Sequence, residues 1–310
     1  MTLTRLGIGT VVAPVLGSYV LFTFDDQAAV DNVQWIYLAI AVFVILLAAL
    51  FLVAKIPEIT DADMEFQAEE TNNTGSQKPF IKQYKLFHAT FAQFCYTGSQ
   101  VAIASFFINY AQDTRPGTSP SLASQLFAGA QAAFAIGRFV GVGLMKFVKP
   151  RMMFLAFISG AIIFTCPAIT QHGNTGIAML YVILFFESIC FPTIVALGMR
   201  GLGRHTKRGS GYIVGGVIGG ACVPPLTGVA ADRHGNGIAM VVPLCFFIGA
   251  STYAIAVNFV PNYVKVIDSF HEAEIGVQGH THDPEKVAVQ RASAEENAAA
   301  AAGPQTSHVA

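Results

Sequence analysis

The apolar stretch 176–200 contains a single carboxylate, Glu187, about midway along its length. An acidic side chain at mid-membrane depth costs about 2.5–3.5 kcal/mol to insert, so Glu187 is expected to face a polar cavity or a partner. Intramembrane carboxylates commonly belong to substrate or proton pathways. The alternative is a protonated structural carboxyl that bonds to neighbouring backbone. We therefore treat Glu187 as a candidate substrate-binding residue.

A second candidate set lies in the stretch 86–111 and consists of Gln93, Tyr96, Gln100 and Asn109. The first three follow a spacing of three and four residues, so they share one face of a helix. Amides and a phenol donate and accept hydrogen bonds without net charge, which suits a neutral polyol such as a sugar. The same groups could instead hold neighbouring helices together, and this alternative stays open.

The composition predicts the kind of protein that would carry these residues. Of the 310 residues, 53% are hydrophobic and 12% are charged, whereas about a quarter of a soluble protein is charged. A net charge of -1 gives no indication of nucleic-acid binding. We expect an all-α polytopic membrane protein that contacts the lipid bilayer. Eight stretches are long and apolar enough to span it: 6–24, 34–54, 86–111, 122–147, 152–170, 176–200, 211–230 and 237–260.

Lysine and arginine gather in alternate loops between these stretches, which places those loops and both termini in the cytoplasm. The plasma membrane is the expected location. Arg138 is close enough to a helix end to extend partly towards the interface, so a structural role is favoured for it. The expected cytoplasmic anchors are Arg138, Lys149, Arg151, Arg204, Lys207 and Arg208.

Glycine and proline mark candidate hinges. The stretch 211–230 contains two overlapping G-x-x-x-G patterns, which begin at Gly215 and Gly216 and end at Gly219 and Gly220. Such patterns let helix backbones approach closely. Pro224 and Pro225 are expected to kink or break this helix, and Pro192 is expected to do the same in 176–200. Ordinary packing in a rigid bundle is the alternative for each residue, but their number favours movement.

Enzyme signatures are missing from the sequence. It contains no G-x-x-x-x-G-K-[ST] phosphate loop, no H-E-x-x-H metal pair and no G-x-S-x-G nucleophile elbow. We therefore expect no enzymatic activity, no cofactor and no metal site.

Four sequence segments carry a specific resemblance: "YTGSQVAIASFFINY" (96–110), "GRFVGVGLMKFVKPR" (137–151), "FPTIVALGMRGLGRHTKRGS" (191–210) and "GGACVPPLTGVAAD" (219–232). In this order they resemble the fucose–galactose–glucose:proton symporter family of the major facilitator superfamily. The resemblance implies transport of a monosaccharide with protons, by alternating access between two six-helix bundles.

The resemblance covers family helices five to twelve only. It implies a partial major facilitator fold: residues 1–54 supply two helices of the N-terminal bundle, and 84–262 form a complete C-terminal six-helix bundle. Residues 55–83 would be the central cytoplasmic linker and 263–310 a disordered tail. In the family, the proton-coupling residues lie mainly on helices one and four, so none is assigned in this chain. An incomplete gene model, an alternative start or a fragment is expected. The competing function is a truncated, non-transporting membrane protein that associates with other membrane proteins.

Overall fold

The structure is a computed structural model that describes residues 38, 41–50, 80–202, 205–265 and 267–268. The predicted span 6–24 lies outside these residues. Of the predicted span 34–54, the structure describes residue 38 and the short apolar helix Ala41–Leu50. Most of the predicted linker and most of the predicted tail also lie outside the described residues.

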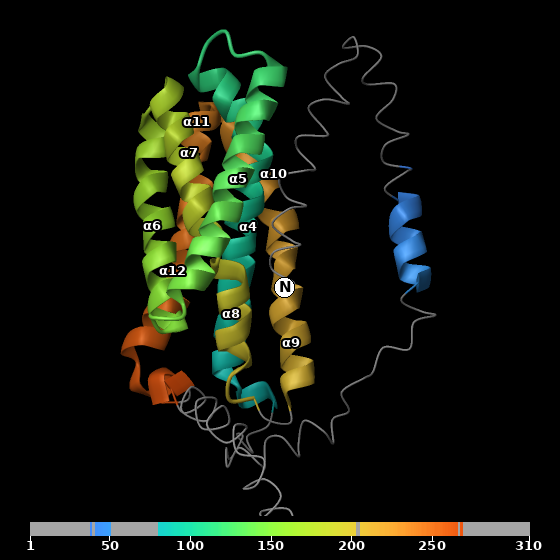
Figure 1. Cartoon of the computed structure of the whole chain (residues 1–310), viewed down its shortest axis with the longest axis vertical. Coiled ribbons are helices and arrows are strands. Elements are labelled where there is room, and N and C mark those ends of the chain that lie inside the picture. The colour runs from blue at the N-terminus through green and yellow to red at the C-terminus, as the bar shows by residue number, and fades with distance from the viewer. Residues whose placement is uncertain (1–37, 39–40, 51–79, 203–204, 266, 269–310) are drawn as a thin grey trace, which may run out of the picture.

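The described main body is helical throughout and contains no strand within the residues that the structure describes. Its helices lie side by side along the long axis, with α4 near the middle, α6 at one edge and α9 and α10 at the other (Figure 1). The elements are, in order, η1 (Phe80–Lys82), α4 (Tyr84–Thr114), α5 (Pro120–Leu144), α6 (Pro150–Thr170), α7 (Gly173–Glu187), α8 (Cys190–Met199), α9 (Thr206–Gly215), η3 (Gly216–Ile218), α10 (Gly219–His234), α11 (Asn236–Ala239) and α12 (Val241–Phe259).

Five segments of this body are long and apolar enough to cross a membrane. They are Pro120–Leu144, Pro150–Thr170, Gly173–Met199, Thr206–His234 and Asn236–Phe259. The 31-residue helix α4 lies alongside them. The described body is therefore all-helical, as predicted, whereas the predicted total of eight spans is not reached within the described residues.

Helix starts follow local sequence chemistry. Ser119 precedes α5, and its side chain accepts a 3.2 Å hydrogen bond from the Leu122 amide. Pro120 and Pro150 occupy the first positions of α5 and α6, where proline lacks only an amide that has no helical partner. Short polar connections thus set the bounds of long apolar helices.

The interior of the body is built around α4. Tyr96, Phe107 and Tyr110 of this helix have no exposed surface, and they pack with buried side chains from the surrounding helices. The Tyr110 hydroxyl donates a 2.6 Å hydrogen bond to the Ala168 carbonyl of α6. A buried phenol finds a polar partner in this way without leaving the apolar interior.

On one side, α4 meets the segment α9–η3–α10 at glycine contacts. A Cβ atom at Gly219 would lie 2.0 Å from the Phe94 carbonyl oxygen, and one at Gly216 would lie 2.8 Å from the Thr90 carbonyl oxygen. Gly215 faces open space. The close backbone approach that the G-x-x-x-G patterns predict therefore occurs, at Gly216 and Gly219 rather than at Gly215.

Pro224 and Pro225 do not break the helix, so of the predicted kink or break only the kink stays a prediction. Both prolines lie inside α10, which continues to His234. The departure from α-helical geometry comes earlier, at the 3-10 turn η3. The two prolines remove only the amide donors to the carbonyls of Gly220 and Ala221, in the first turn of α10, and the helix continues beyond them.

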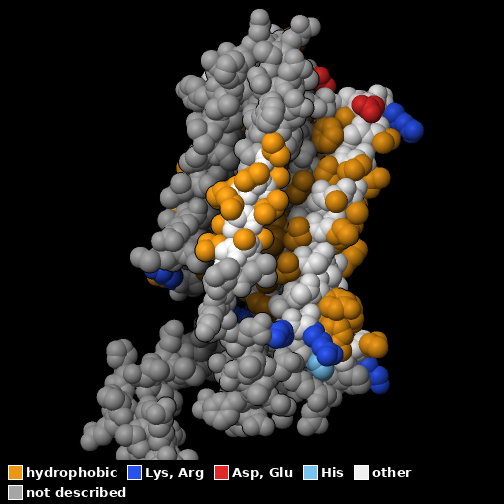
Figure 2. Space-filling model, turned by 90° about the vertical axis from the view of Figure 1, so that its right-hand side faces the viewer, with side chains coloured by type: hydrophobic (Ala, Val, Ile, Leu, Met, Phe, Trp, Pro, Cys, Tyr) orange, Lys and Arg blue, Asp and Glu red, His pale blue; other side chains and the backbone are white. Residues whose placement is uncertain are grey.

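The two ends of the body differ in charge. On the face shown in Figure 2, hydrophobic side chains cover the middle, Lys and Arg gather at the lower end, and acidic side chains lie at the upper end together with a basic one. The α9–α10 segment carries exposed apolar side chains, among them Tyr212, Ile218 and Val229. An apolar band between charged ends is the pattern of a membrane-embedded surface.

Candidate functional site

A pocket of about 470 Å³ lies between α4, α5 and α7. Its polar lining residues are Gln100 and Ser105 of α4, Gln131 and Arg138 of α5, and Glu187 of α7. Its apolar lining residues are Val101, Ala104, Phe127, Phe134 and Leu184. A few convergent polar groups on an apolar wall are typical of a small-molecule site.

Glu187 is the most deeply buried polar residue of this lining, with 1% of its surface exposed. Its Oε1 atom has no hydrogen-bond partner within the part of the chain that the structure describes. A buried carboxyl oxygen without a partner is costly, so such an atom commonly marks a functional contact. This carboxyl is available to a ligand or a proton.

Glu187 lies in the pocket at the point where helix α7 ends. Glu187 is the last residue of α7, Ser188 and Ile189 interrupt the helix, and α8 begins at Cys190. Pro192 has no amide hydrogen, so it leaves the Ser188 carbonyl without its usual helical donor. The interruption predicted from Pro192 therefore occurs about one turn before the proline, in the middle of the apolar segment Gly173–Met199.

Side chains from other helices bond to the carbonyl groups at this interruption. The Arg138 Nε atom donates a 3.1 Å hydrogen bond to the Ser188 carbonyl. The Tyr96 hydroxyl donates a 2.6 Å hydrogen bond to the Glu187 carbonyl. Carbonyl groups at membrane depth that lack their helical donors require such partners, because the hydrocarbon region has no water to supply them. The interruption is thus fixed from both α4 and α5.

Two glycines of α5 allow the interruption between α7 and α8 to lie close against α5. A Cβ atom at Gly137 would lie 2.5 Å from the Phe185 carbonyl oxygen, and one at Gly141 would lie 2.3 Å from Ile189 Cγ2. The "GRFVG" segment therefore presses α5 against the junction of α7 and α8. Arg138 follows Gly137 directly, so the same contact brings its side chain to the pocket.

Arg138 lines the pocket, although it was predicted to be a cytoplasmic anchor. Its guanidinium carbon is 4.7 Å from the centre of the Phe134 ring, in cation–π geometry. It forms no ion pair with Glu187 in this structure, although both line the same pocket. The pocket thus presents one basic and one acidic side chain that are not joined to each other.

Of the four polar residues predicted to share a site, Gln93, Tyr96, Gln100 and Asn109, only Gln100 lines the pocket. Tyr96 does not line it, but its hydroxyl donates a hydrogen bond to the Glu187 carbonyl. Gln93 is fully buried, and its Nε2 atom is 3.3 Å from Thr97 Oγ1. Asn109 is exposed and is not among the pocket residues. The Oε1 atom of Gln93 lacks a partner within the described residues.

Neither Gln131 nor the pocket position of Arg138 was predicted from the sequence. A signal for both was present, because Phe127, Gln131, Phe134 and Arg138 follow spacings of four, three and four residues. That pattern places them on one face of α5. Two polar residues on one face of an otherwise apolar span would have indicated a cavity-lining helix.

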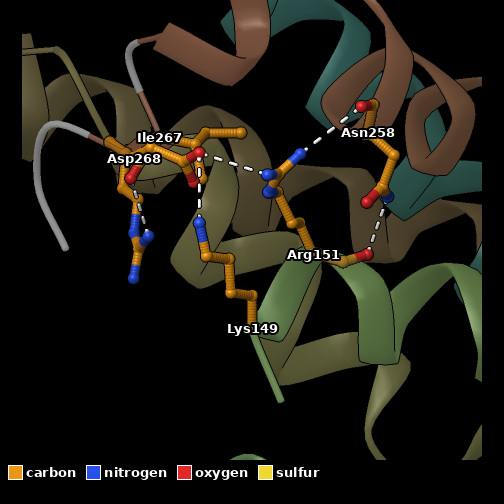
Figure 3. A network of polar contacts seen from close by, with 6 residues as sticks. Lys149, Arg151, Asn258, Ile267 and Asp268 are labelled. Atoms are coloured by element: carbon orange, nitrogen blue, oxygen red, sulfur yellow. Dashed lines mark hydrogen bonds and ion pairs between the residues drawn. The ribbon is translucent and has the colours of Figure 1, made fainter.

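The other predicted anchors lie at the basic end of the body. Lys149 and Arg151 both bond to Asp268, with N–O distances of 3.4 and 3.1 Å, as Figure 3 shows. Lys207 and Arg208 line an apolar hollow between α4 and α9. Arg204 lies outside the described residues. Within the described residues, no group of three His, Cys, Asp or Glu side chains is arranged to hold a metal ion.

Comparison with known proteins gives a consistent result. A model of the Major Facilitator Superfamily matches residues 4–221. The chain is 32% identical over 267 residues to a glucose/galactose transporter of Brucella abortus biovar 1 (strain 9-941), which covers 82% of this chain and 62% of the relative. It is 33% identical over 224 residues to the L-fucose-proton symporter of Escherichia coli (strain K12), with 72% of this chain and 51% of the relative covered.

A solved structure shares the fold. The crystal structure of FucP, a major facilitator superfamily transporter in the outward conformation, matches with a TM-score of 0.62 and 29% sequence identity. The match covers 81% of this chain and 65% of that chain. The chain therefore spans only part of the length of these relatives. It belongs to the major facilitator superfamily of membrane transporters, and its resemblance to the fucose–galactose–glucose:proton symporters is confirmed.

Proposed function

We propose that this chain binds a monosaccharide of the glucose, galactose or fucose type and contributes to its proton-coupled transport by alternating access. The observation that carries the proposal is the pocket between α4, α5 and α7, in which Gln100, Gln131, Arg138 and Glu187 converge. The names of the relatives support the same substrate class.

The pocket chemistry suits a sugar. The amides of Gln100 and Gln131 can each donate and accept, so they match hydroxyl groups that do the same. The carboxyl of Glu187 accepts, and the guanidinium of Arg138 donates. Phe127 and Phe134 provide apolar surface for the ring carbons. We propose these residues as the sugar-binding wall of this bundle, with Tyr96 as a positioning residue.

The interruption after Glu187 supports a conformational role. Discontinuous membrane helices commonly form substrate sites, and rocking of bundles around the site exchanges access between the two sides of the membrane. We propose that Ser188 and Ile189 let α7 and α8 move relative to each other, with Pro192 preventing a continuous helix. Gly216 and Gly219 would keep α10 against α4 during this movement.

The proposed organisation follows the family. Residues 1–54 would belong to an N-terminal bundle, 55–83 to the linker, 84–262 to the C-terminal bundle and 263–310 to the tail. The basic end of the body would face the cytoplasm, with both termini on that side of the plasma membrane. A sugar bound to the described pocket would also contact the partner bundle.

The second candidate is a membrane protein that associates with other membrane proteins without transporting sugar. It is favoured by one observation, that the matches cover 62% and 51% of two transporters' lengths.

Reconstitution separates the two candidates. The purified chain is placed in proteoliposomes, and binding and uptake of radiolabelled glucose, galactose and L-fucose are measured with and without an inward proton gradient. We expect saturable uptake of at least one sugar that falls when a protonophore removes the gradient. Binding without uptake would favour the second candidate, and neither binding nor uptake would contradict the proposed sugar site.

A further inference from the structure

A second hollow, of about 450 Å³, lies at the basic end of the body, away from the sugar pocket. Its lining includes Lys82, Lys85, Arg200 and Lys265. None of the described residues that line it is Asp or Glu. Lys85 donates to the Asn262 carbonyl, and the other basic side chains, Lys82, Arg200 and Lys265, create a positive potential in the hollow that attracts anions.

Three segments distant in sequence build this hollow. Lys82 and Gln83 precede α4, Arg200 and Gly201 follow α8, and Lys265 follows α12. Gly201 has a φ of 80°, a left-handed conformation that favours glycine and turns the chain sharply after Arg200. The basic side chains are thus brought together by tertiary structure and not by a run of charge in the sequence.

The segment after α12 is held firmly in place at this end. The Arg200 Nη1 atom donates a 3.1 Å hydrogen bond to the Ile267 carbonyl. The neighbouring carboxylate, Asp268, bonds to Lys149 and Arg151 (Figure 3). A carbonyl group carries no net charge, so it does not neutralise Arg200. The Asp268 carboxylate is already paired with Lys149 and Arg151.

Gln83 supplies the second, independent sign of a ligand. Its side chain lines the hollow, only 8% of its surface is exposed, and its Nε2 donor has no partner within the described residues. It stands at the N-cap of α4 but makes no side-chain cap hydrogen bond. A buried donor beside the positive end of a 31-residue helix is suited to an oxyanion.

We propose that this hollow binds a phosphate monoester group. A phosphate monoester carries more than one negative charge and several acceptor oxygens, so it can engage ammonium groups, a guanidinium and an amide donor together. The group could belong to a phosphatidic acid headgroup or to a soluble phosphate ester, which share this chemistry. The inference is independent of sugar transport, because no residue of the sugar pocket takes part.

Ligand binding to the full chain tests the proposal. The soluble probes are inorganic phosphate and glycerol 3-phosphate, titrated against the purified chain by calorimetry. The lipid probe is phosphatidic acid in phosphatidylcholine nanodiscs, compared with phosphatidylcholine alone by thermal unfolding, because a ligand of the native state raises the unfolding temperature. Binding of either kind supports the site, and the arm that responds identifies the source of the phosphate.

Paired variants make the result specific. The double substitution Lys82→Gln and Lys265→Gln changes two exposed side chains, so the fold is retained, and it should weaken binding by about tenfold or more. Gln83→Leu should weaken binding as well. The control is Lys207→Gln, which removes the same charge at the same end but outside this hollow. No binding of any probe, or equal weakening by the control, would overturn the proposal.

Discussion

Two membrane-length segments of this chain are interrupted, and the two interruptions are built differently. The first separates α7 from α8 after Glu187, and donors from Tyr96 and Arg138 bond to its carbonyl groups. The second is the 3-10 turn η3 between α9 and α10, where Gly216 and Gly219 meet the α4 backbone. The first borders the pocket of the candidate site, whereas the second borders an apolar hollow.

The two interruptions differ in the kind of contact that they make. At the first interruption, polar side chains of three helices are brought to one place, and a carboxyl oxygen is left without a partner. At the second, Gly216 and Gly219 lie against carbonyl oxygens of the α4 backbone, and the basic residues Lys207 and Arg208 line the adjoining apolar hollow. We infer that the first interruption serves the ligand and that the second holds two helices together.

Glycine replacement at the two interruptions gives the largest expected effect. Gly137→Ala and Gly219→Ala both place a Cβ atom against a backbone oxygen, at 2.5 and 2.0 Å. Each should destabilise the protein by about 1–3 kcal/mol, measured by thermal unfolding in detergent. Gly137→Ala should also weaken sugar binding, because it displaces the pocket.

The control for this pair is Gly215→Ala, since a Cβ atom there meets nothing within 4 Å. It should change the stability by less than about 0.5 kcal/mol. Sugar binding that is weakened equally by Gly137→Ala and Gly219→Ala would remove the proposed distinction between the two interruptions.

Replacement of Arg138 by Gln tests the first interruption alone. The substitution removes the donor to the Ser188 carbonyl and the cation of the pocket. Loss of a buried partner should cost about 1–3 kcal/mol of stability, and sugar affinity should fall by about tenfold. Unchanged sugar affinity together with lower stability would restrict Arg138 to a structural role.

Tyr96→Phe is expected to have a smaller effect. It removes one hydroxyl that donates a 2.6 Å hydrogen bond to the Glu187 carbonyl, at a cost of about 1–2 kcal/mol. Tyr110→Phe is the matched control, because its hydroxyl donates a bond of the same length to the Ala168 carbonyl, away from the pocket. Only Tyr96→Phe should lower sugar affinity, and equal affinities in the two variants would contradict the positioning role of Tyr96.

The smallest effect is expected for Asp268→Asn, which removes both ion pairs of the segment after α12. Partly exposed ion pairs contribute about 0–1 kcal/mol, so unfolding should change little, and less still at high salt. Sugar binding should be unaffected because the site is far from both interruptions. A large loss of sugar binding would show that the basic end is coupled to the pocket.

Much of the fold follows from local sequence patterns, whereas the pocket does not. Apolar runs bounded by polar residues predicted the helices from α4 to α12, because membrane helices are apolar over their whole length. The G-x-x-x-G pattern predicted close contact with a neighbour, but not that Gly216 and Gly219 would make it while Gly215 faced open space. The choice of neighbour depends on tertiary packing.

The candidate site, too, was predicted only as far as local sequence patterns reach. Glu187 was identified because a carboxylate in an apolar run is unusual, and Gln100 because it lies on a polar face. Arg138 was placed at the interface because its distance from a helix end allows this, yet the close contact at Gly137 directs it into the pocket. Spacing along one helix predicts a face, but the groups opposite that face come from other helices.

The central claim is that Glu187 belongs to a sugar site, and Glu187→Gln tests it most directly. Gln keeps the shape and hydrogen-bonding capacity of the side chain but cannot ionise. The other titratable groups around it are Tyr96 on α4, Arg138 on α5 and Cys190 on α8, all unchanged in the variant. The measurement is sugar binding and uptake by the reconstituted chain as a function of pH. We predict that the variant shows weaker uptake or a changed pH dependence, whereas binding and uptake equal to those of the unaltered chain at every pH would contradict the account.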